Sequence, residues 1–303
     1  MIKSFFKLIY NLTKIPMTII LFKTPIKKKL INYMINYRSR GIKNIFDKYI
    51  NKIFWEEFFL KLNEEEKNDI RDKTLSFGEG KIWAEGYFSK SFKSLKDLEK
   101  IKIGQINYLE AEPIYEDIIS YLKEQNEKVS IIQIGSSSGR DLNLIRNYFP
   151  EHEYISTDIN DEILDFQKTK YKFNNFKFLK AYAQNIDKIC NHFNLENKKK
   201  LIFSIGSAQY LSPNELTKFI SKISKLKKTS LFILEPIQIS FLNKKKQHSL
   251  YRSNISYNHN YENYFSENGL KISLKKIIEP YDESHRIHGD TAHYYIKCID
   301  NNE

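Results

Sequence analysis

Five small residues near the middle of the chain follow an apolar run and precede a segment with helical spacing. The stretch reads KVSIIQIGSSSGRDLNLI over residues 128–145, and its loop consists of Gly135, Ser136, Ser137, Ser138 and Gly139. Small residues let the backbone approach a ligand closely, and unpaired N–H groups at the start of the following helix favour an anionic group. The loop therefore predicts a site for a phosphate or carboxylate of a ligand.

Two common phosphate-binding loops do not fit this stretch. A Walker loop needs a lysine after its last glycine, but Arg140 follows Gly139. A dinucleotide loop of the GxGxxG type needs glycines where Ser137 and Arg140 stand, so two of its three glycines are missing. An NAD-dependent oxidoreductase remains an alternative chemistry.

The loop resembles the first motif of the class I S-adenosylmethionine-dependent methyltransferases, and the resemblance extends over about residues 108–300. In that motif an acidic or polar residue is followed by small residues at every second position, a frame that Gln133, Gly135, Ser137 and Gly139 occupy. Gln133 replaces the usual acid and Ser137 the usual middle glycine. The resemblance implies S-adenosylmethionine as cofactor, with Ser136 also in its binding loop.

The next predicted strand, in YISTDIN, ends in an acid. Asp158 stands nineteen residues after Gly139, where the resemblance implies a carboxylate that accepts hydrogen bonds from both ribose hydroxyls of the cofactor. It also places Ile159 among the cofactor-binding residues. The alternative is that Asp158 caps the following helix, a role that Asn160 or Asp161 could fill as well.

Two later loops extend the resemblance. AYAQNI resembles the family's adenine-binding segment, but Tyr182 replaces the usual Asp, which leaves recognition to the backbone of Ala183 and to Gln184. LIFSIGSAQYLSPNEL resembles the fourth motif, with Gly206 beside the methionine end of the cofactor. Many relatives carry a histidine at the position of Gln209, a candidate catalytic residue whose glutamine side chain cannot act as a base.

Histidines beyond the fifth predicted strand are the remaining candidates for a base. His259, just before a predicted helix in SYNHNYENYF, is preferred on placement alone, and a surface histidine is the alternative. His285 lies in the loop between the last two strands, which reaches the cofactor side if the sixth strand is parallel. His285 and His288 with Asp290 could also form a metal site, but loop histidines need no ligand to explain them, and we predict none.

The elements that must position these residues follow from the periodicity beyond residue 108. Short apolar runs alternate with amphipathic helical segments, and this alternation predicts parallel strands with helices on both faces of the sheet. We predict a doubly wound α/β domain with a mostly parallel seven-stranded sheet and an antiparallel last strand. The seven expected strands are VSIIQI, HEYISTDI, FKFLKAY, LIFSIGS, SLFILEP, LKISLKKII and HYYIKCI.

The formal charge of +12 is concentrated at the beginning of the chain. Residues 1–52 hold ten Lys and two Arg against the single acid Asp47, whereas the other 251 residues are nearly neutral. No uncharged run there is longer than that of Ile15–Phe22, which is far shorter than the ~20 residues that span a bilayer. The segment predicts either a basic apolar helical leader on an anionic membrane surface or a helical extension packed on the main domain.

Residues 53–107 join this leader to the predicted methyltransferase domain at 108–303. WEEFFLKLNEEEKNDIRDK has helical spacing, and FGEGKIWAEGYFSKSF combines glycine with aromatic residues. The second stretch is either an elbow whose aromatics enter the core or a lid over a substrate pocket.

Composition narrows the class of protein and of acceptor. With 303 residues and 41% apolar residues the chain is globular, and two cysteines without CxxC spacing favour a reducing compartment. The neutral body and the absence of an NPPY-like motif argue against a nucleic-acid partner. Arg252 and Arg286 could bind an acidic or phosphorylated acceptor, or they are solvated.

These patterns predict a cytoplasmic methyltransferase, peripheral to the inner membrane face. The expected acceptor is a hydroxyl of a small molecule or of a sugar or surface-glycan precursor. The alternative from another class is a non-catalytic binding protein with a methyltransferase-like fold.

Overall fold

A computed structural model describes residues 27–29, 31, 59–76, 112–242, 247–253, 255–278 and 291–299. The chain divides into two compact units, Met1–Gly80 with Ser253–Ile255 and Lys81–Arg252 with Ser256–Glu303, and each is described by itself. The predicted boundaries at residues 52 and 107 lie outside the described residues and stay predictions.

In the first unit, the predicted helical spacing corresponds to a 3-10 turn, η2 (Phe59–Lys61), and to helix α4 (Glu64–Ser76). Asn63 and Glu66 cap α4 reciprocally. Asn63 Oδ1 accepts the Glu66 N–H at 2.9 Å, and Glu66 Oε2 accepts the Asn63 N–H at 3.3 Å. The first turn of α4 is acidic, which suits the positive end of the helix dipole.

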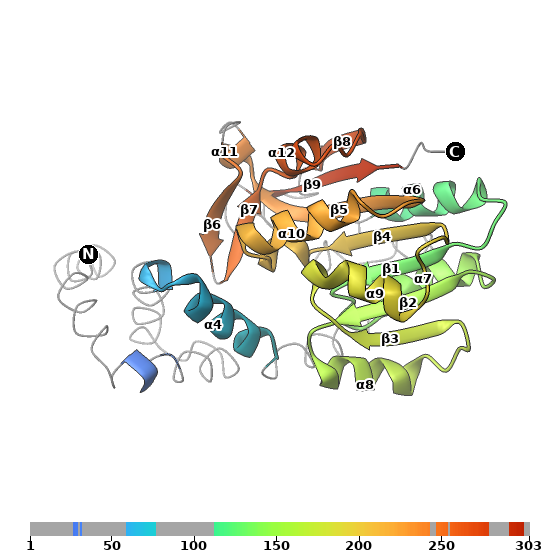
Figure 1. The fold of residues 1–303 in the computed structure, drawn as a ribbon, viewed down its shortest axis with the longest axis horizontal. Helices are drawn as coiled ribbons and strands as arrows, with labels where there is room; N and C mark the ends of the chain where they lie inside the picture. Colours follow the sequence, from blue (N-terminus) through green and yellow to red (C-terminus); the bar gives the residue numbers. More distant parts are fainter. Residues whose placement is uncertain are drawn as a thin grey trace, which may run out of the picture. The chain divides into compact units, whose positions relative to one another are not determined.

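The second unit contains a seven-stranded sheet in the order β3-β2-β1-β4-β5-β9-β8 (Figure 1). The first five strands are parallel, and β9 is antiparallel to both β5 and β8, so β8 runs parallel to β5. The predicted doubly wound, mostly parallel seven-stranded sheet with an antiparallel last strand is confirmed. The strands are β1 (Ser130–Ile134), β2 (Glu153–Asp158), β3 (Phe176–Lys180), β4 (Lys200–Ile205), β5 (Thr229–Gln238), β8 (Ile272–Ile278) and β9 (Thr291–Cys298).

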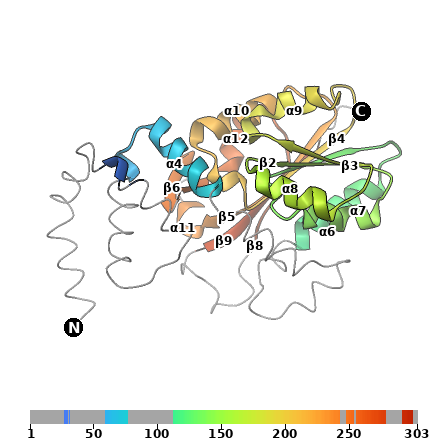
Figure 2. The same cartoon turned by 90° about the horizontal axis from the view of Figure 1, so that it is seen from below.

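Helices cover both faces of this sheet. Figure 2 shows α9, α10 and α12 on one side and α6, α7 and α8 on the other. The bounds are α6 (Glu112–Lys123), α7 (Arg140–Tyr148), α8 (Asp161–Lys170), α9 (Ile186–His192), α10 (Pro213–Ile223) and α12 (Tyr261–Glu267), with the short elements η5 (Ala183–Asn185), η6 (Ala208–Tyr210) and α11 (Ile239–Leu242).

The pleat of each strand sends successive side chains into two separate apolar clusters. On β1, Ile131 packs into the cluster that contains residues of α6 and α7, whereas Ile132 and Ile134 pack with residues of α9, α10 and α12. All five residues of β1 are buried. Burial on both faces explains why the predicted parallel strands read as continuous apolar runs.

A small second sheet lies between β5 and α12 along the chain and was not predicted. It pairs β6 (Ser249–Ser253) with β7 (Ser256–His259). The two strands read SLYRS and SYNH, and neither is an apolar run or a regular alternation, so periodicity gave no signal for them.

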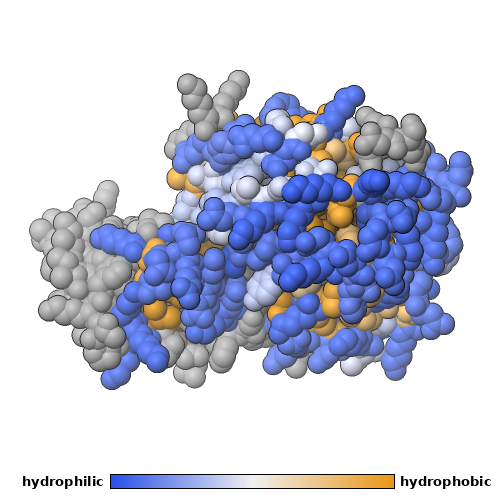
Figure 3. All heavy atoms as spheres, in the orientation of Figure 1, coloured by the Kyte–Doolittle hydropathy of each residue, from blue (hydrophilic) through white to orange (hydrophobic). Residues whose placement is uncertain are grey.

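The described surface is largely hydrophilic on the side shown in Figure 3, with small apolar areas between the polar ones. The large hydrophobic side chains that are exposed among the described residues are Tyr148 and Ile277. A helix with the length and apolar character needed to cross a membrane is absent from the described part of the chain. The predicted membrane-binding leader lies almost wholly outside that part.

Candidate functional site

The loops after β1 and β4 meet at the point where the strand order of the sheet reverses. β1 pairs with β2 on one side and with β4 on the other. The chain therefore leaves β1 toward one face of the sheet and leaves β4 toward the other, which is the arrangement of a topological switch point. Gly135, Gly139 and Gly206 all have positive φ angles, 63°, 72° and 68°. Gly139 is the N-cap of α7 and provides no side-chain cap. A ligand crevice at this switch point would therefore be lined by backbone, as expected for a site that receives an anionic group.

Ser136 lies beneath the loop after β1. Its hydroxyl accepts a hydrogen bond from Gln167 Nε2 at 2.9 Å and bonds to the hydroxyl of Ser156, which also bonds to Gln167 Oε1. Gln167 Nε2 donates further to the carbonyl of Ser137 at 2.6 Å. The Ser136 side chain thus anchors the loop to Ser156 and Gln167, and its backbone N–H donates to the carbonyl of Thr157 at 2.9 Å. The predicted cofactor contact of Ser136 stays a prediction.

The loops after β1 and β4 also touch each other. Ser207 Oγ donates to the carbonyl of Gly135 at 3.0 Å. A Cβ added to Gly135 would lie 2.3 Å from Ser207 Oγ, whereas one added to Gly206 would meet nothing closer than Gln209 Nε2 at 3.9 Å. Gly135 is therefore required both by its left-handed backbone and by the close approach of Ser207.

Replacing Gly135 by alanine is expected to destabilise the protein more than replacing Gly206. Both substitutions place a side chain at positive φ, which costs about 1–2 kcal/mol. Gly135→Ala additionally displaces Ser207 and breaks its hydrogen bond, for a further ~1 kcal/mol. Urea unfolding of the two variants measures the difference, and equal losses would show that the Ser207 contact is unimportant.

Asp158 ends β2 beside this crevice and is 8% exposed. Its Oδ2 accepts the N–H of Ser137 at 3.1 Å, and its Oδ1 accepts the N–H of Asn160 at 3.1 Å. Burial raises the pKa of Asp158 to about 6, against the opposing effect of backbone hydrogen bonds from Asn160, Ser137 and Ile159. Asn160 caps α8 with its own side chain, so Asp158 is not needed as the helix cap.

Gln133, at the position of the family's acid, contacts a carboxylate that comes from α7 instead. Its Nε2 donates to Asp141 Oδ2 at 2.7 Å, and Tyr115 donates its hydroxyl to Asp141 Oδ1 at 2.7 Å. Burial, with the charge of Asp141, raises the pKa of Tyr115 well above its ordinary value and keeps it a donor. Gln133 Oε1 is buried without a hydrogen-bond partner among the described residues.

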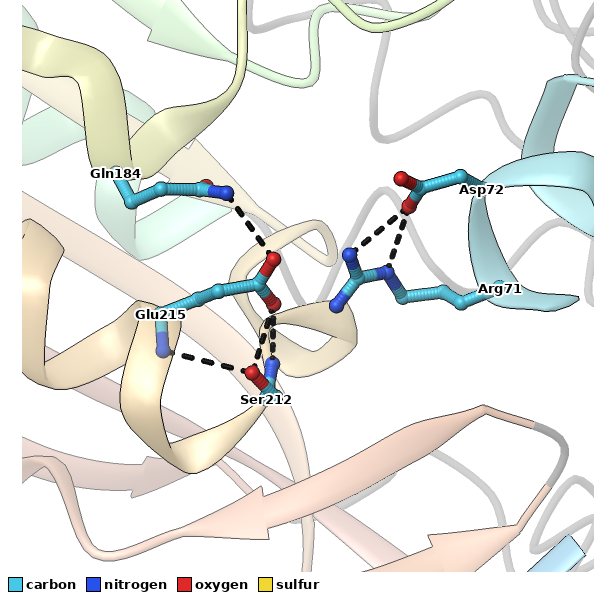
Figure 4. A network of polar contacts seen from close by, with 5 residues as sticks. All are labelled: Arg71, Asp72, Gln184, Ser212 and Glu215. Carbon is cyan, nitrogen blue, oxygen red and sulfur yellow. Dashed lines mark hydrogen bonds and ion pairs between the residues drawn. The ribbon is translucent and has the colours of Figure 1, made fainter. Parts of the chain in front are cut away.

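The predicted adenine segment is anchored to the start of α10 (Figure 4). Ala183 is buried in η5, and Gln184 Nε2 donates to Glu215 Oε1 at 3.0 Å. Glu215 Oε2 accepts the N–H and hydroxyl of Ser212 at 2.8 and 2.9 Å, in a capping box. This contact fixes the Gln184 amide so that Oε1 is the free atom, and that oxygen has no partner among the described residues.

A buried carboxylate from β5 organises the loop after β4. Glu235 is 0% exposed, and its Oε1 accepts the hydroxyl of Ser204 at 2.7 Å and the N–H groups of Ser207 and Ala208 at 3.0 and 2.8 Å. Its Oε2 accepts the N–H of Gln209 at 3.2 Å. Burial raises the pKa of Glu235, in opposition to these four donors.

Gln209 bridges the loop after β4 and the small sheet. Its Nε2 donates to the carbonyl of Gly206 at 2.7 Å, and its Oε1 accepts a hydrogen bond from Arg252 Nη2 on β6. Both ends of the amide are therefore engaged, and the side chain positions its neighbours. We find no group on Gln209 that could take a proton from an acceptor.

His259, the preferred base from the sequence, is buried at 1% exposure with both ring nitrogens hydrogen-bonded. Nδ1 bonds to Ser249 Oγ at 2.7 Å, and Nε2 bonds to the carbonyl of Leu211 at 3.1 Å, which requires Nε2 to carry the proton. Burial lowers the pKa of His259 to about 3. In this conformation the imidazole offers no free nitrogen, so its contacts favour a positioning role.

A neutral His259 has a direct spectroscopic consequence. Because its pKa is lowered to about 3, the ring is expected to stay neutral, with a single proton on Nε2, from pH 5 to pH 8. Histidine NMR titration checks this. A His259 resonance that titrates near pH 6.5 would restore it as a candidate base.

Several predicted residues lie outside the described part of the chain. They include His285, Arg286, His288 and Asp290 in the loop after β8, so the proposed base and the metal alternative there keep their standing as predictions. Since β8 runs parallel to β5, its carboxyl end lies at the same edge of the sheet as the crevice.

Four residues with structural roles at these loops were not predicted as site residues: Asp141, Ser207, Glu215 and Glu235. The S-x-x-E pattern of Ser212 and Glu215 was a readable capping signal. Glu235 also had a signal, because an acid that ends a fully apolar strand run needs buried partners.

Comparison with known proteins adds fold-level likenesses. No protein-family model matches the chain, and no curated protein matches its sequence significantly. A geranyl diphosphate methyltransferase in complex with S-adenosylmethionine is 9% identical, with 62% of this chain and 84% of that chain covered and a TM-score of 0.44.

Two further solved structures give similar values. An O-methyltransferase of a polyketide synthase from Brevibacillus brevis, bound to S-adenosyl-L-homocysteine, is 11% identical over 67% of this chain and 76% of its own, with a TM-score of 0.45. Geranyl diphosphate C-methyltransferase from Streptomyces coelicolor A3(2) is 11% identical over 64% and 79%, with a TM-score of 0.41. Likenesses of this size do not bear on the activity of this chain.

Proposed function

We propose that this chain is a class I S-adenosylmethionine-dependent methyltransferase. The observation that carries the proposal is Asp158, a buried carboxylate at the end of β2 beside the backbone-lined crevice. Its two oxygens can accept hydrogen bonds from the two hydroxyls of a ribose. The raised pKa fits this role, since a buried carboxylate gains from a ligand that adds two hydrogen-bond donors to those of the backbone.

The other predicted cofactor residues fit the same ligand. The uncapped start of α7 with Gly135 and Gly139 suits the methionine carboxylate, and Gly206 lies across the crevice from them. Gln184 Oε1, oriented by Glu215, is an unpartnered acceptor that suits the exocyclic amine of adenine.

The chemistry asks the chain mainly for positioning. The methyl donor supplies an already activated methyl group, so the protein has to hold the acceptor near it, exclude water and, for a hydroxyl acceptor, remove a proton. His259 and Gln209 have no free basic nitrogen. We therefore retain His285 as the candidate base.

Calorimetry separates this proposal from its alternatives. The protein is expected to bind S-adenosylmethionine and S-adenosylhomocysteine with micromolar affinity and to give no heat with NAD. Binding of the methyl donor without turnover of any hydroxyl acceptor would favour the methyltransferase-like binding protein. The hydrogen bonds that engage the His259 and Gln209 side chains also favour that alternative. Heat with NAD alone would indicate the oxidoreductase.

The affinity for S-adenosylhomocysteine is expected to fall on acidification. The ligand needs the carboxylate form of Asp158, whose pKa in the free protein is about 6. The association constant should be nearly constant above pH 7 and about tenfold lower at pH 5, where most Asp158 is protonated. Calorimetry across this range tests the expectation, and Asp158→Asn should bind weakly with no pH dependence near 6.

We propose O-methylation of a small molecule or of a sugar or surface-glycan precursor as the reaction. Residues 1–52 are basic and apolar, whereas the rest of the chain is nearly neutral. This distribution of charge supports association of the enzyme with an anionic inner membrane face. Flotation with anionic liposomes, with and without residues 1–52, tests the location. If both forms stay with the soluble fraction at low salt, the membrane part of the proposal fails.

A further inference from the structure

Arg252 on β6 is held rigidly at the carboxyl edge of β4 and β5. Its Nη1 donates to the carbonyl of Pro236 at 3.0 Å, its Nη2 donates to Gln209 Oε1, and its Nε donates to Ser256 Oγ at 3.4 Å. All three acceptors are neutral. A guanidinium has five N–H donors, so one on Nη1 and one on Nη2 remain available.

The charge of Arg252 is not balanced by an ion pair with a described residue. The carboxylate that influences it, Glu235, already accepts four hydrogen bonds on its two oxygens. Burial lowers the pKa of Arg252, which means that the cation is partly removed from water. A partly desolvated cation without a direct ion pair gains from a ligand that supplies the opposite charge.

A second donor lies near this guanidinium. Tyr261, at the start of α12, is 1% exposed, and its hydroxyl has no hydrogen-bond partner among the described residues. Burial raises its pKa, and the charges of Glu235 and Arg252 both act on it. A neutral phenol and a guanidinium are both hydrogen-bond donors, and an oxyanion can accept from either.

We propose that Arg252, assisted by Tyr261, binds an anionic oxygen group of the acceptor, so that the substrate is a phosphorylated or carboxylated molecule. Gln209 links Arg252 directly to the loop after β4, which lies at the crevice proposed for the methyl donor. The inference names the substrate class of the proposed methyltransferase and rests on that function. The recognised chemistry is an oxyanion, from a phosphate ester or from a carboxylate.

Anion binding by the full-length chain tests the proposal. In the presence of S-adenosylhomocysteine, inorganic phosphate or acetate should raise the melting temperature more than chloride at matched ionic strength. Arg252→Gln should weaken the anion response roughly tenfold to a hundredfold, and Tyr261→Phe should weaken it less. A larger response to phosphate identifies a phosphorylated acceptor, and a larger response to acetate a carboxylated one.

The matched control is Arg146→Gln on α7. Arg146, like Arg252, is partly buried, but its guanidinium lies 3.5 Å from the centroid of the Phe173 ring and donates a hydrogen bond to Asn175. Its replacement should leave the anion response unchanged. Equal responses of wild type and Arg252→Gln, or no response beyond chloride, would overturn the proposal.

Two further measurements test the anion site even if Arg252→Gln does not fold or the proposed methyltransferase function fails. If Arg252→Gln does not fold, phosphate should protect Arg252 of the wild type, but not Arg146, from modification by phenylglyoxal, read by peptide mass spectrometry. Titration with S-adenosylhomocysteine in the same samples separates the two ideas. Cofactor binding without an Arg252-dependent anion response sinks the substrate class alone, and an anion response without cofactor binding sinks the methyltransferase alone.

Discussion

Asp158→Ala is expected to abolish measurable binding of S-adenosylhomocysteine while the protein stays folded. Two charge-assisted hydrogen bonds to the ribose are lost, which corresponds to at least about 3 kcal/mol, or roughly a hundredfold in affinity. Stability should change by no more than ~1 kcal/mol. The carboxylate is costly to bury, as its raised pKa indicates, and this cost offsets the loss of its bonds to Ser137 and Asn160.

Asp161→Ala is the matched control for this experiment. Asp161 lies three residues further along, is exposed, and pairs with Lys180 at the surface. Calorimetry of the two variants side by side distinguishes loss of a specific contact from a general loss of negative charge. If Asp158→Ala binds as tightly as Asp161→Ala, the ribose assignment is wrong.

Glu235→Gln is expected to have the largest effect on stability, about 3–5 kcal/mol. The carboxylate accepts four hydrogen bonds while fully buried, and an amide would turn its NH2 group toward at least one backbone donor, the N–H of Gln209. The loop after β4 would lose its anchor. Urea unfolding measures the stability, and calorimetry should show weakened cofactor binding, since Ser207 contacts the loop after β1.

Ser204→Ala serves as the comparison for Glu235→Gln. It removes one neutral donor from the same carboxylate and leaves the three backbone donors, so a loss of about 1 kcal/mol is expected. Equal stabilities of Glu235→Gln and the wild type would mean that Glu235 is already protonated in the folded protein.

Most of the large sheet could be predicted because burial on both faces leaves a strong signal. Runs such as those around Ile132 and Phe232 are apolar at most positions, and the helices between them force parallel pairing. The β6–β7 pair could not be predicted in this way, because its strands are short and carry polar residues such as Arg252 and Asn258 that are held by tertiary contacts.

Residues of the candidate site were predictable only where the shape of the backbone determines the residue type. Gly135, Gly139 and Asp158 follow from a loop and a strand end, and the structure brings them together. The partners of buried side chains were not predictable. Nothing local in SYNHNYENYF shows that both nitrogens of His259 are engaged, because Ser249 and Leu211 come from other segments.

The β6–β7 pair shares no ladder with the seven-stranded sheet in the described chain, yet it carries Arg252. Exchanging it for a hairpin of another sequence would break none of the hydrogen bonds between the strands of the large sheet. If Arg252 selects the acceptor as proposed, acceptor preference could therefore diverge during evolution, or be changed in the laboratory, through this strand pair alone, while the strands and loops proposed to hold the nucleoside are inherited unchanged.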